Sequence, residues 1–139
     1  YHVTLDRCIY TVKAPEKIQN VSKIIKEGLN AVLNKVKPGT TGHELENTWK
    51  KVINKYGVKK DSRIGYPIGI GYSPTWGELT TSFRKGDKNV LKENMTFHCI
   101  PALWLQNYGI VISESFIVKK NGPERLTDYE QKLFELRDF

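Results

Sequence analysis

The stretch from residue 63 to residue 78, RIGYPIGIGYSPTWGE, constrains the fold of this chain more than any other segment. It is dense in glycine, carries two prolines, and ends on a single acid, Glu78, two residues after Trp76. Glycine permits positive φ angles and close approach of the backbone to other groups, so the segment is predicted to be an irregular loop. Glycine density alone leaves two interpretations open: a plain connector, or a loop that lines a pocket.

Two amphipathic helices are predicted before this loop. The first begins at Pro15, which suits a first helical turn, and its apolar residues repeat at helical spacing to about residue 36. The second follows Thr41, whose spacing to Glu44 is that of a capping box, and Gly57 is a suitable stop.

The remaining regular segments are predicted from β-branched and aromatic content. An order of strand, two helices and then antiparallel strands indicates an α+β domain. The predicted strands cover residues 3–12, 80–83, 95–105 and 110–119, and a short helix is predicted at 128–138.

Composition narrows the classes of partner. The net charge of +7 comes from lysines scattered along the chain, without an Arg-rich run or a nucleic-acid motif, so we expect a solvated basic surface and no nucleic-acid partner. No apolar run approaches the ~20 residues of a membrane span, and no signal peptide is visible. Cys8 and Cys99 form no CxxC pair and are expected to be buried thiols. These features favour a cytoplasmic protein that does not contact membranes.

Short motifs distributed along the chain resemble those of the pita-bread hydrolases, in the same order. This family includes methionine aminopeptidase, Xaa-Pro peptidases, creatinase and ectoine hydrolase. The segment RIGYPIGI is similar to the family's HR-x-GHGIGL, and YHVTLDR is similar to its Y-x-x-D-x-T-R strand. Further matches are residues 36–39 to I-R-P-G, 90–95 to V-L-E-P-G-M, 109–118 to G-x-R-x-E-D-x-x-x-V, and 126–127 to L-T. The resemblance implies the second half of a pita-bread domain, with two helices packed on a curved antiparallel sheet across residues 1–139.

Metal-dependent members of this family hold two divalent ions with Asp, Asp, His, Glu and Glu, which activate a bridging water. The resemblance puts the first Asp before residue 1. It puts the other four on Thr4, Tyr66, Ile100 and Ser113, with Glu114 one position beyond the last. A shift of one residue in a strand points the side chain to the opposite face, so Glu114 is a poor replacement. We therefore expect neither a metal nor another cofactor.

Creatinase and ectoine hydrolase resemble this fold and hydrolyse C–N bonds without the dinuclear centre, and the departures in this chain resemble the ectoine-hydrolase branch. That resemblance gives a small-molecule substrate. It also gives a set of candidate residues: Glu78, Tyr66 and His98 as catalytic, and Trp76, His2, Glu114 and Gly69 as substrate-binding.

Each candidate has a structural alternative. Glu78 beside Trp76 suits proton transfer or attack on an amidine carbon, but an ordinary strand-edge glutamate has the same sequence signature. Tyr66 is expected either to donate a hydrogen bond to substrate or to close the core. Trp76 is expected to stack on a planar cation or simply to pack. His98 and His2 are expected to orient site groups or to be structural.

Three functions remain open. They are a metal-independent hydrolase of a small cyclic amidine or related compound, a metal-dependent Xaa-Pro dipeptidase, and an inactive pita-bread module that binds peptide or protein. Because the chain begins on Tyr1 inside a predicted strand, the first half of the domain and an N-terminal domain are expected upstream, in a protein that forms a homodimer.

Overall fold

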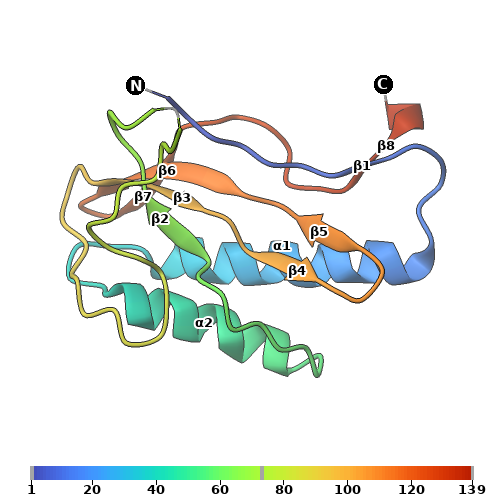
Figure 1. Cartoon of the computed structure of the whole chain (residues 1–139), viewed down its shortest axis with the longest axis horizontal. Helices are drawn as coiled ribbons and strands as arrows, with labels where there is room; N and C mark the ends of the chain where they lie inside the picture. The colour runs from blue at the N-terminus through green and yellow to red at the C-terminus, as the bar shows by residue number, and fades with distance from the viewer. Residues whose placement is uncertain (1, 73, 139) are drawn as a thin grey trace.

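The computed structural model describes residues 2–72 and 74–138. Two antiparallel helices, α1 (Glu16–Lys35) and α2 (Gly42–Asn54), lie side by side below the strands in Figure 1. α1 begins directly after Pro15, and α2 begins with the predicted capping box between Thr41 and Glu44. Both predicted helices are confirmed. Among the described residues, no helix is long and apolar enough to cross a membrane.

A four-stranded sheet forms the centre of the strand layer, in the order β2-β3-β6-β7, with every neighbouring pair antiparallel. Two smaller pairs flank it: β4 with β5 is antiparallel, and β1 with β8 is parallel. The central strands are β2 (Gly65–Pro67), β3 (Thr96–Cys99), β6 (Glu114–Lys119) and β7 (Gly122–Arg125). The flanking strands are β1 (Ile9–Tyr10), β4 (Ala102–Trp104), β5 (Gly109–Val111) and β8 (Phe134–Glu135), followed by the 3₁₀ turn Leu136–Asp138.

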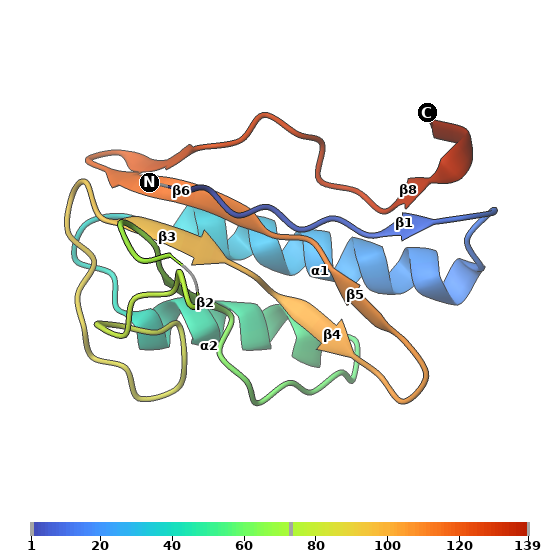
Figure 2. The same ribbon diagram turned by 45° about the horizontal axis from the view of Figure 1, so that its top comes forward.

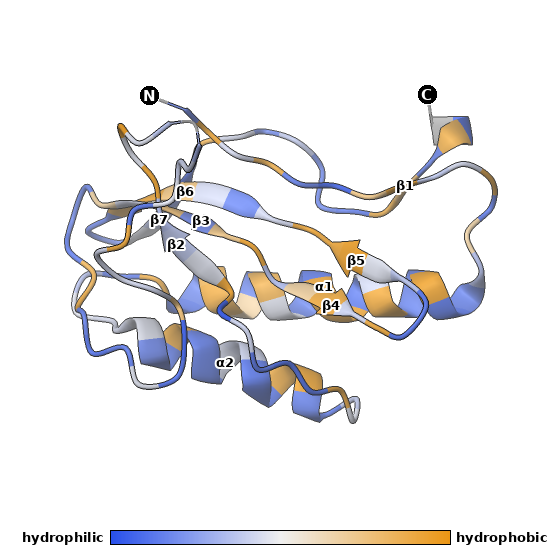
Figure 3. Ribbon diagram, in the orientation of Figure 1, coloured by the Kyte–Doolittle hydropathy of each residue, from blue (hydrophilic) through white to orange (hydrophobic). Residues whose placement is uncertain are grey.

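The apolar core lies between the helices and one face of this sheet. Both helices carry apolar and polar residues on different parts of their surface in Figure 3, as expected for helices with one buried face. Trp49 of α2 is fully buried against α1, where a Cβ on Gly28 would lie 2.2 Å from its ring. Phe97 of β3 and Phe116 of β6 are register partners and pack in the same core. The predicted α+β class is therefore confirmed.

The first differences from the predicted strands lie in residues 3–12 and 95–105. Only Ile9–Tyr10 of residues 3–12 forms a strand, although residues 4–6 run beside the start of β6 and exchange hydrogen bonds with Ser113 and Ser115. Figure 2 shows this N-terminal segment running alongside β6. The predicted strand 95–105 is split into β3 and β4 at Pro101, because proline has no N–H to continue the ladder.

Three further predictions are corrected. Residues 110–119 are divided between β5 and β6, and residues 80–83 form no strand, although Phe83 exchanges backbone hydrogen bonds with Ile64 and Gly65. The predicted helix at 128–138 is wrong except for the short 3₁₀ helix Leu136–Asp138 at its end. Phe134 is buried and donates its N–H to the carbonyl of Cys8, so a distant partner strand decides this segment.

Candidate active site

One row of polar side chains crosses the sheet on the face opposite the helices. Tyr66 of β2 is the register partner of His98 of β3, which is the partner of Ser115 of β6. Because side chains alternate along a strand and the neighbouring Phe97 and Phe116 enter the core, this row points away from the helices. Two sequence-predicted catalytic residues, Tyr66 and His98, are thus adjacent.

Tyr66 lies at the centre of a hydrogen-bonded cluster. Its hydroxyl is 2.9 Å from Nδ1 of His98 and accepts a hydrogen bond from Nε1 of Trp76 at 3.1 Å. The Arg63 guanidinium lies 4.9 Å from the centre of its ring. A Cβ on Gly77 would lie 3.1 Å from the same ring, so a glycine at this position lets the loop approach Tyr66 closely.

Asp6 extends this cluster from the N-terminal segment. Its Oδ2 lies 3.4 Å from Nε2 of the buried His98 and accepts a hydrogen bond from the Ser113 hydroxyl at 3.1 Å. The Asp6 backbone N–H in turn donates to that hydroxyl at 2.7 Å. Hydrogen bonding to His98 lowers the pKa of Asp6 below its ordinary value, against the opposing effect of partial burial, and Ser113 and Arg7 also lower it. Asp6 is therefore an ionised partner of His98.

Glu78 lies at the end of the glycine-rich loop, which closes on itself. Gly77 forms a bridge with Ile68, and the Glu78 N–H donates to the Pro67 carbonyl at 2.9 Å. One carboxylate oxygen, Oε1, accepts the N–H of Gly71 at 3.1 Å. A Cβ on Gly71 would lie 3.1 Å from that oxygen, so the glycine lets the backbone approach the carboxylate. Oε2 has no hydrogen-bond partner within residues 2–72 and 74–138.

A small cavity of about 240 Å³ adjoins the polar row, with a mostly apolar lining that includes His2, Gly69 and Ile68. His2 lies edge-on to Trp76, at 6.3 Å between ring centres, and its buried Nε2 has no hydrogen-bond partner among the described residues. A buried imidazole nitrogen without a partner has hydrogen-bonding capacity for a ligand. Two predicted substrate-binding residues, His2 and Gly69, thus line one cavity.

Glu114 is enclosed in a network of hydrogen bonds within the protein. Its side chain is fully buried, and Arg7 donates to Oε1 at 2.5 Å while Arg125 donates to both oxygens. Thr127 and Gln131 supply further hydrogen bonds to the same carboxylate. Both carboxylate oxygens of Glu114 are bonded to other residues of this chain, so the structure does not support its predicted contact with a substrate.

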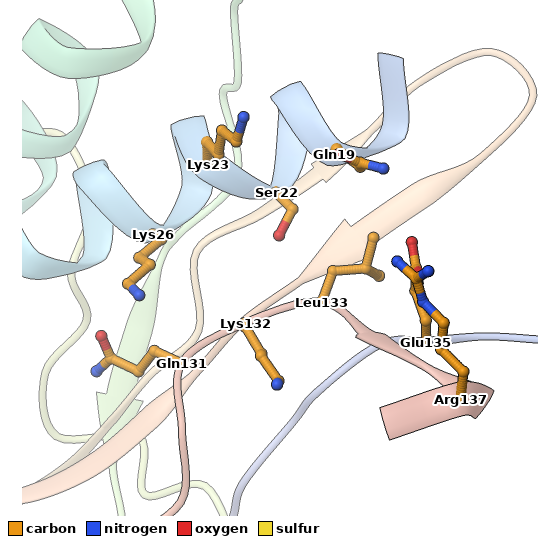
Figure 4. A pocket seen from close by; sticks show the side chains of 9 residues that line it. All are labelled: Gln19, Ser22, Lys23, Lys26, Gln131, Lys132, Leu133, Glu135 and Arg137. Carbon is orange, nitrogen blue, oxygen red and sulfur yellow. The ribbon is translucent and has the colours of Figure 1, made fainter. Parts of the chain in front are cut away.

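Two further cavities are lined by none of the predicted site residues. Figure 4 shows one of about 300 Å³ between α1 and the C-terminal segment, lined by basic side chains such as Lys23 and Lys26 and by Glu135. The other, about 570 Å³, lies between the end of β2 and residues 88–97.

Comparisons with known proteins agree with this fold and with the placement of the motifs. The model of the metallopeptidase family M24 matches residues 1–120. The chain belongs to this family. It is 36% identical to the ectoine hydrolase of Halomonas elongata over 135 residues, which covers 96% of this chain and 34% of that protein. It is 38% identical to the uncharacterised hydrolase/peptidase y4tM of Sinorhizobium fredii, with the same coverage of both chains. The chain thus spans about a third of the length of these relatives.

The fold is also that of solved pita-bread enzymes. The X-Pro aminopeptidase of Thermotoga maritima superposes with a TM-score of 0.86 over 95% of this chain and 36% of its own, at 24% identity. The predicted resemblance to the pita-bread hydrolases, and to the second half of their domain, is confirmed.

The family name implies a metal, and the residues at the four positions that the resemblance gives for its ligands do not suit one. The Thr4 hydroxyl is hydrogen-bonded to Ser115, and the Ser113 hydroxyl is hydrogen-bonded to Asp6. The Tyr66 hydroxyl is bonded to His98 and Trp76, and Ile100 has no atom that could bind a metal. Within the described part of the chain, no three His, Cys, Asp or Glu side chains gather closely enough to hold an ion. A hard divalent ion prefers carboxylates and imidazole, which these positions lack.

Sequence reasoning missed Asp6, which is central to the cluster. It stands in the YHVTLDR segment two residues after Thr4, and residues two apart in an extended segment share a face. That spacing was the available signal, because Thr4 and Asp6 both contact the β6 region that carries Ser113 and Ser115.

Proposed function

We propose that the full-length protein is a hydrolase of C–N bonds that acts without a metal on a small cyclic amidine, similar to ectoine, or a related compound. The observation that carries the proposal is the occupation of the family's metal-ligand imidazole position by Tyr66, whose hydroxyl is bonded to His98 and Trp76. The likeness to an ectoine hydrolase over 96% of the chain supports the choice of substrate class.

Glu78 is the proposed reacting carboxylate. The Gly71 N–H fixes Oε1, which leaves Oε2 to attack the electron-poor amidine carbon or to take a proton from the attacking water. Both routes need an anionic oxygen held in a fixed place, and the glycine-rich loop supplies that placement.

Substrate binding is assigned to the residues around this loop. The Trp76 indole is 43% exposed and offers a ring on which a planar amidinium can stack. Arg63 lies over Tyr66, and the unpartnered Nε2 of His2 is available in the adjoining cavity. Tyr66 and His98 are the proposed proton-transfer groups beside the reacting carbon.

The substitution Glu78→Gln tests this assignment in the full-length gene product. It preserves size and the hydrogen bond from Gly71 but removes the charge, so turnover of an ectoine-like amidine is expected to fall about 10²–10⁴-fold without loss of folding. The matched control is Glu124→Gln, because Glu124 is 60% exposed and its ion pair with Lys119 is long, at 3.9 Å. Full activity in Glu78→Gln would refute the role of this carboxylate.

Removal of divalent metal tests the second part of the proposal. Because the donor set at the family's ligand positions does not suit a metal, turnover is expected to survive dialysis against a chelator unchanged. Elemental analysis accompanies the assay. Stoichiometric Mn, Co, Fe or Zn whose loss abolishes activity would replace the proposal with a metal-dependent Xaa-Pro dipeptidase.

The exposed loop residues favour one further candidate, a module that binds peptide or protein without catalysis. Ile70, Tyr72 and Leu79 are 80%, 75% and 89% exposed, which is high for apolar side chains grouped on one loop. Assays on cyclic amidines, creatine and Xaa-Pro dipeptides decide between the two. A wild-type protein inactive on all three classes would favour the binding module.

A further inference from the structure

The carboxylate of Asp6 fixes where the proton sits on His98. An ionised carboxylate can only accept hydrogen bonds, and its Oδ2 is the polar atom facing Nε2 of His98, at 3.4 Å. That nitrogen is buried and makes no hydrogen bond of good geometry within the described residues, so the charge of Asp6 at 3.4 Å is what acts on it. A lone pair on Nε2 would be repelled by this negative charge, whereas an N–H is attracted to it, so the neutral imidazole carries its hydrogen on Nε2.

This tautomer determines the direction of the next hydrogen bond. With the hydrogen on Nε2, the Nδ1 of His98 is a lone-pair acceptor, and the Tyr66 hydroxyl 2.9 Å away must donate to it. The indole Nε1 of Trp76 can only donate, and it does so to the same phenolic oxygen at 3.1 Å. A phenol has one hydrogen and two lone pairs, so one lone pair of Tyr66 is left.

We propose that Asp6 is a positioning residue that orders this chain of hydrogen bonds, so that Tyr66 presents a lone pair, and not a hydrogen, to the substrate. The site then selects a group that donates hydrogen bonds, such as the N–H of an amidinium, over a carbonyl or carboxylate oxygen. The inference deepens the proposed function and rests on it for the identity of the substrate class. The sequence suggested that Tyr66 donates a hydrogen bond to the substrate, whereas here its oxygen accepts one.

The same order gives Tyr66 a path for a proton. When its oxygen takes a proton from the attacking water or from a substrate N–H, its own hydroxyl proton moves to Nδ1 of His98. The imidazole becomes an imidazolium that keeps its hydrogen on Nε2, and the Asp6 carboxylate stabilises that charge without itself taking a proton.

The tautomer of His98 is the first test, and it needs no substrate. In full-length protein with ¹⁵N-labelled histidine, NMR at neutral pH is expected to show Nε2 of His98 protonated and Nδ1 unprotonated. The signals of His98 are assigned as those that disappear in His98→Gln. In Asp6→Ala the Nδ1–H form is expected to become populated, whereas Asp61→Ala, a control at a carboxylate that is 96% exposed, leaves the signal unchanged. A hydrogen on Nδ1 of neutral His98 in the wild type would overturn the proposal.

The second test asks what the Tyr66 oxygen accepts. Acetamidinium is titrated against an amidinium fully methylated on nitrogen, which has the same charge and no N–H. Tyr66→Phe is expected to weaken acetamidinium binding about tenfold, as for loss of a hydrogen bond to a charged group, and to leave the methylated ligand unaffected. Equal weakening of both ligands, or of neither, would overturn the preference for a donor.

The two proposals fail separately. A correct tautomer and a selective loss of acetamidinium, in a protein that hydrolyses nothing, would leave this inference standing and remove the proposed reaction. Turnover that depends on Glu78 in a protein whose neutral His98 carries its hydrogen on Nδ1 would do the reverse.

Discussion

Two sites lie next to each other along the chain and differ in their role: the cluster around His98, which we call the chemical side, and the buried ion pair of Glu114, which we call the structural side. Asp6 and Ser113 bond to each other and Asp6 also contacts His98, whereas the next residues along the chain, Arg7 and Glu114, form a buried ion pair. The Asp6 side chain is 42% exposed, and that of Glu114 is 0% exposed. Alternation along extended backbone is what sends adjacent residues to these two environments.

The difference between the two carboxylates lies in how completely each is partnered. Glu114 receives hydrogen bonds from two arginines, Thr127 and Gln131, so its charge is compensated and it holds three segments of the chain together. Asp6 has a long 3.4 Å contact to a histidine that is itself linked to a half-buried tyrosine. Saturated charges stabilise a fold, whereas a chain of partly satisfied groups that reaches solvent can exchange protons.

The largest expected effect is on the structural side. Glu114→Ala leaves Arg7, whose side chain is 7% exposed, with a buried charge and without its salt-bridge partner. Breaking a buried pair in this way costs about 3–5 kcal/mol of unfolding free energy. Urea denaturation of the full-length protein measures it, with Glu124→Ala as the exposed control. A loss below about 1 kcal/mol would show that the buried cluster is not the structural half of this comparison.

A smaller effect, on turnover, is expected from the hydrogen bond between Trp76 and Tyr66. Trp76→Phe keeps an aromatic ring but removes the N–H that donates to Tyr66, so turnover is expected to fall by up to about tenfold with little change in stability. Trp104→Phe is the matched control, because Trp104 is 71% exposed on β4, outside the cluster. Equal effects of the two substitutions would remove the distinction between a site tryptophan and a surface one.

The smallest expected effect concerns the pH dependence of stability. The pKa of Asp6 is lowered from 3.8, so its interactions stabilise the fold above that value and are lost as pH falls through the folded-state pKa. Asp6→Asn is expected to reduce the unfolding free energy at neutral pH by no more than about 1 kcal/mol, because the carboxylate is partly exposed. That difference shrinks at pH well below 3.8 in paired urea titrations. A difference that grows with acid would contradict the sign of the shift.

Local sequence determined most of the helical layer and much of the loop, although Gly65–Pro67 inside the predicted loop form strand β2 by pairing with β3. The spacing of apolar residues gave α1 and α2, and Thr41 with Glu44 gave the start of α2, since these signals act within one or two helical turns. The density of glycine between residues 63 and 78 predicted a loop in which the backbone approaches other groups, and Gly71 and Gly77 make such approaches to Glu78 and Tyr66. The family motifs identified Tyr66, Trp76 and Glu78 as residues of one region.

Only the tertiary structure decided which of these residues touch and which carboxylate joins them. Asp6 and Ser113 are 107 positions apart in the sequence, and Tyr66 and His98 are 32 apart, so no local pattern pairs them. The parallel pairing of β1 with β8 likewise overrode the helical pattern at residues 128–138. Register across the sheet separates Asp6 from Arg7 and Ser113 from Glu114, and register is set by contacts between distant strands. The sequence by itself therefore determined the elements and the family, and the packing of distant strands decided the site.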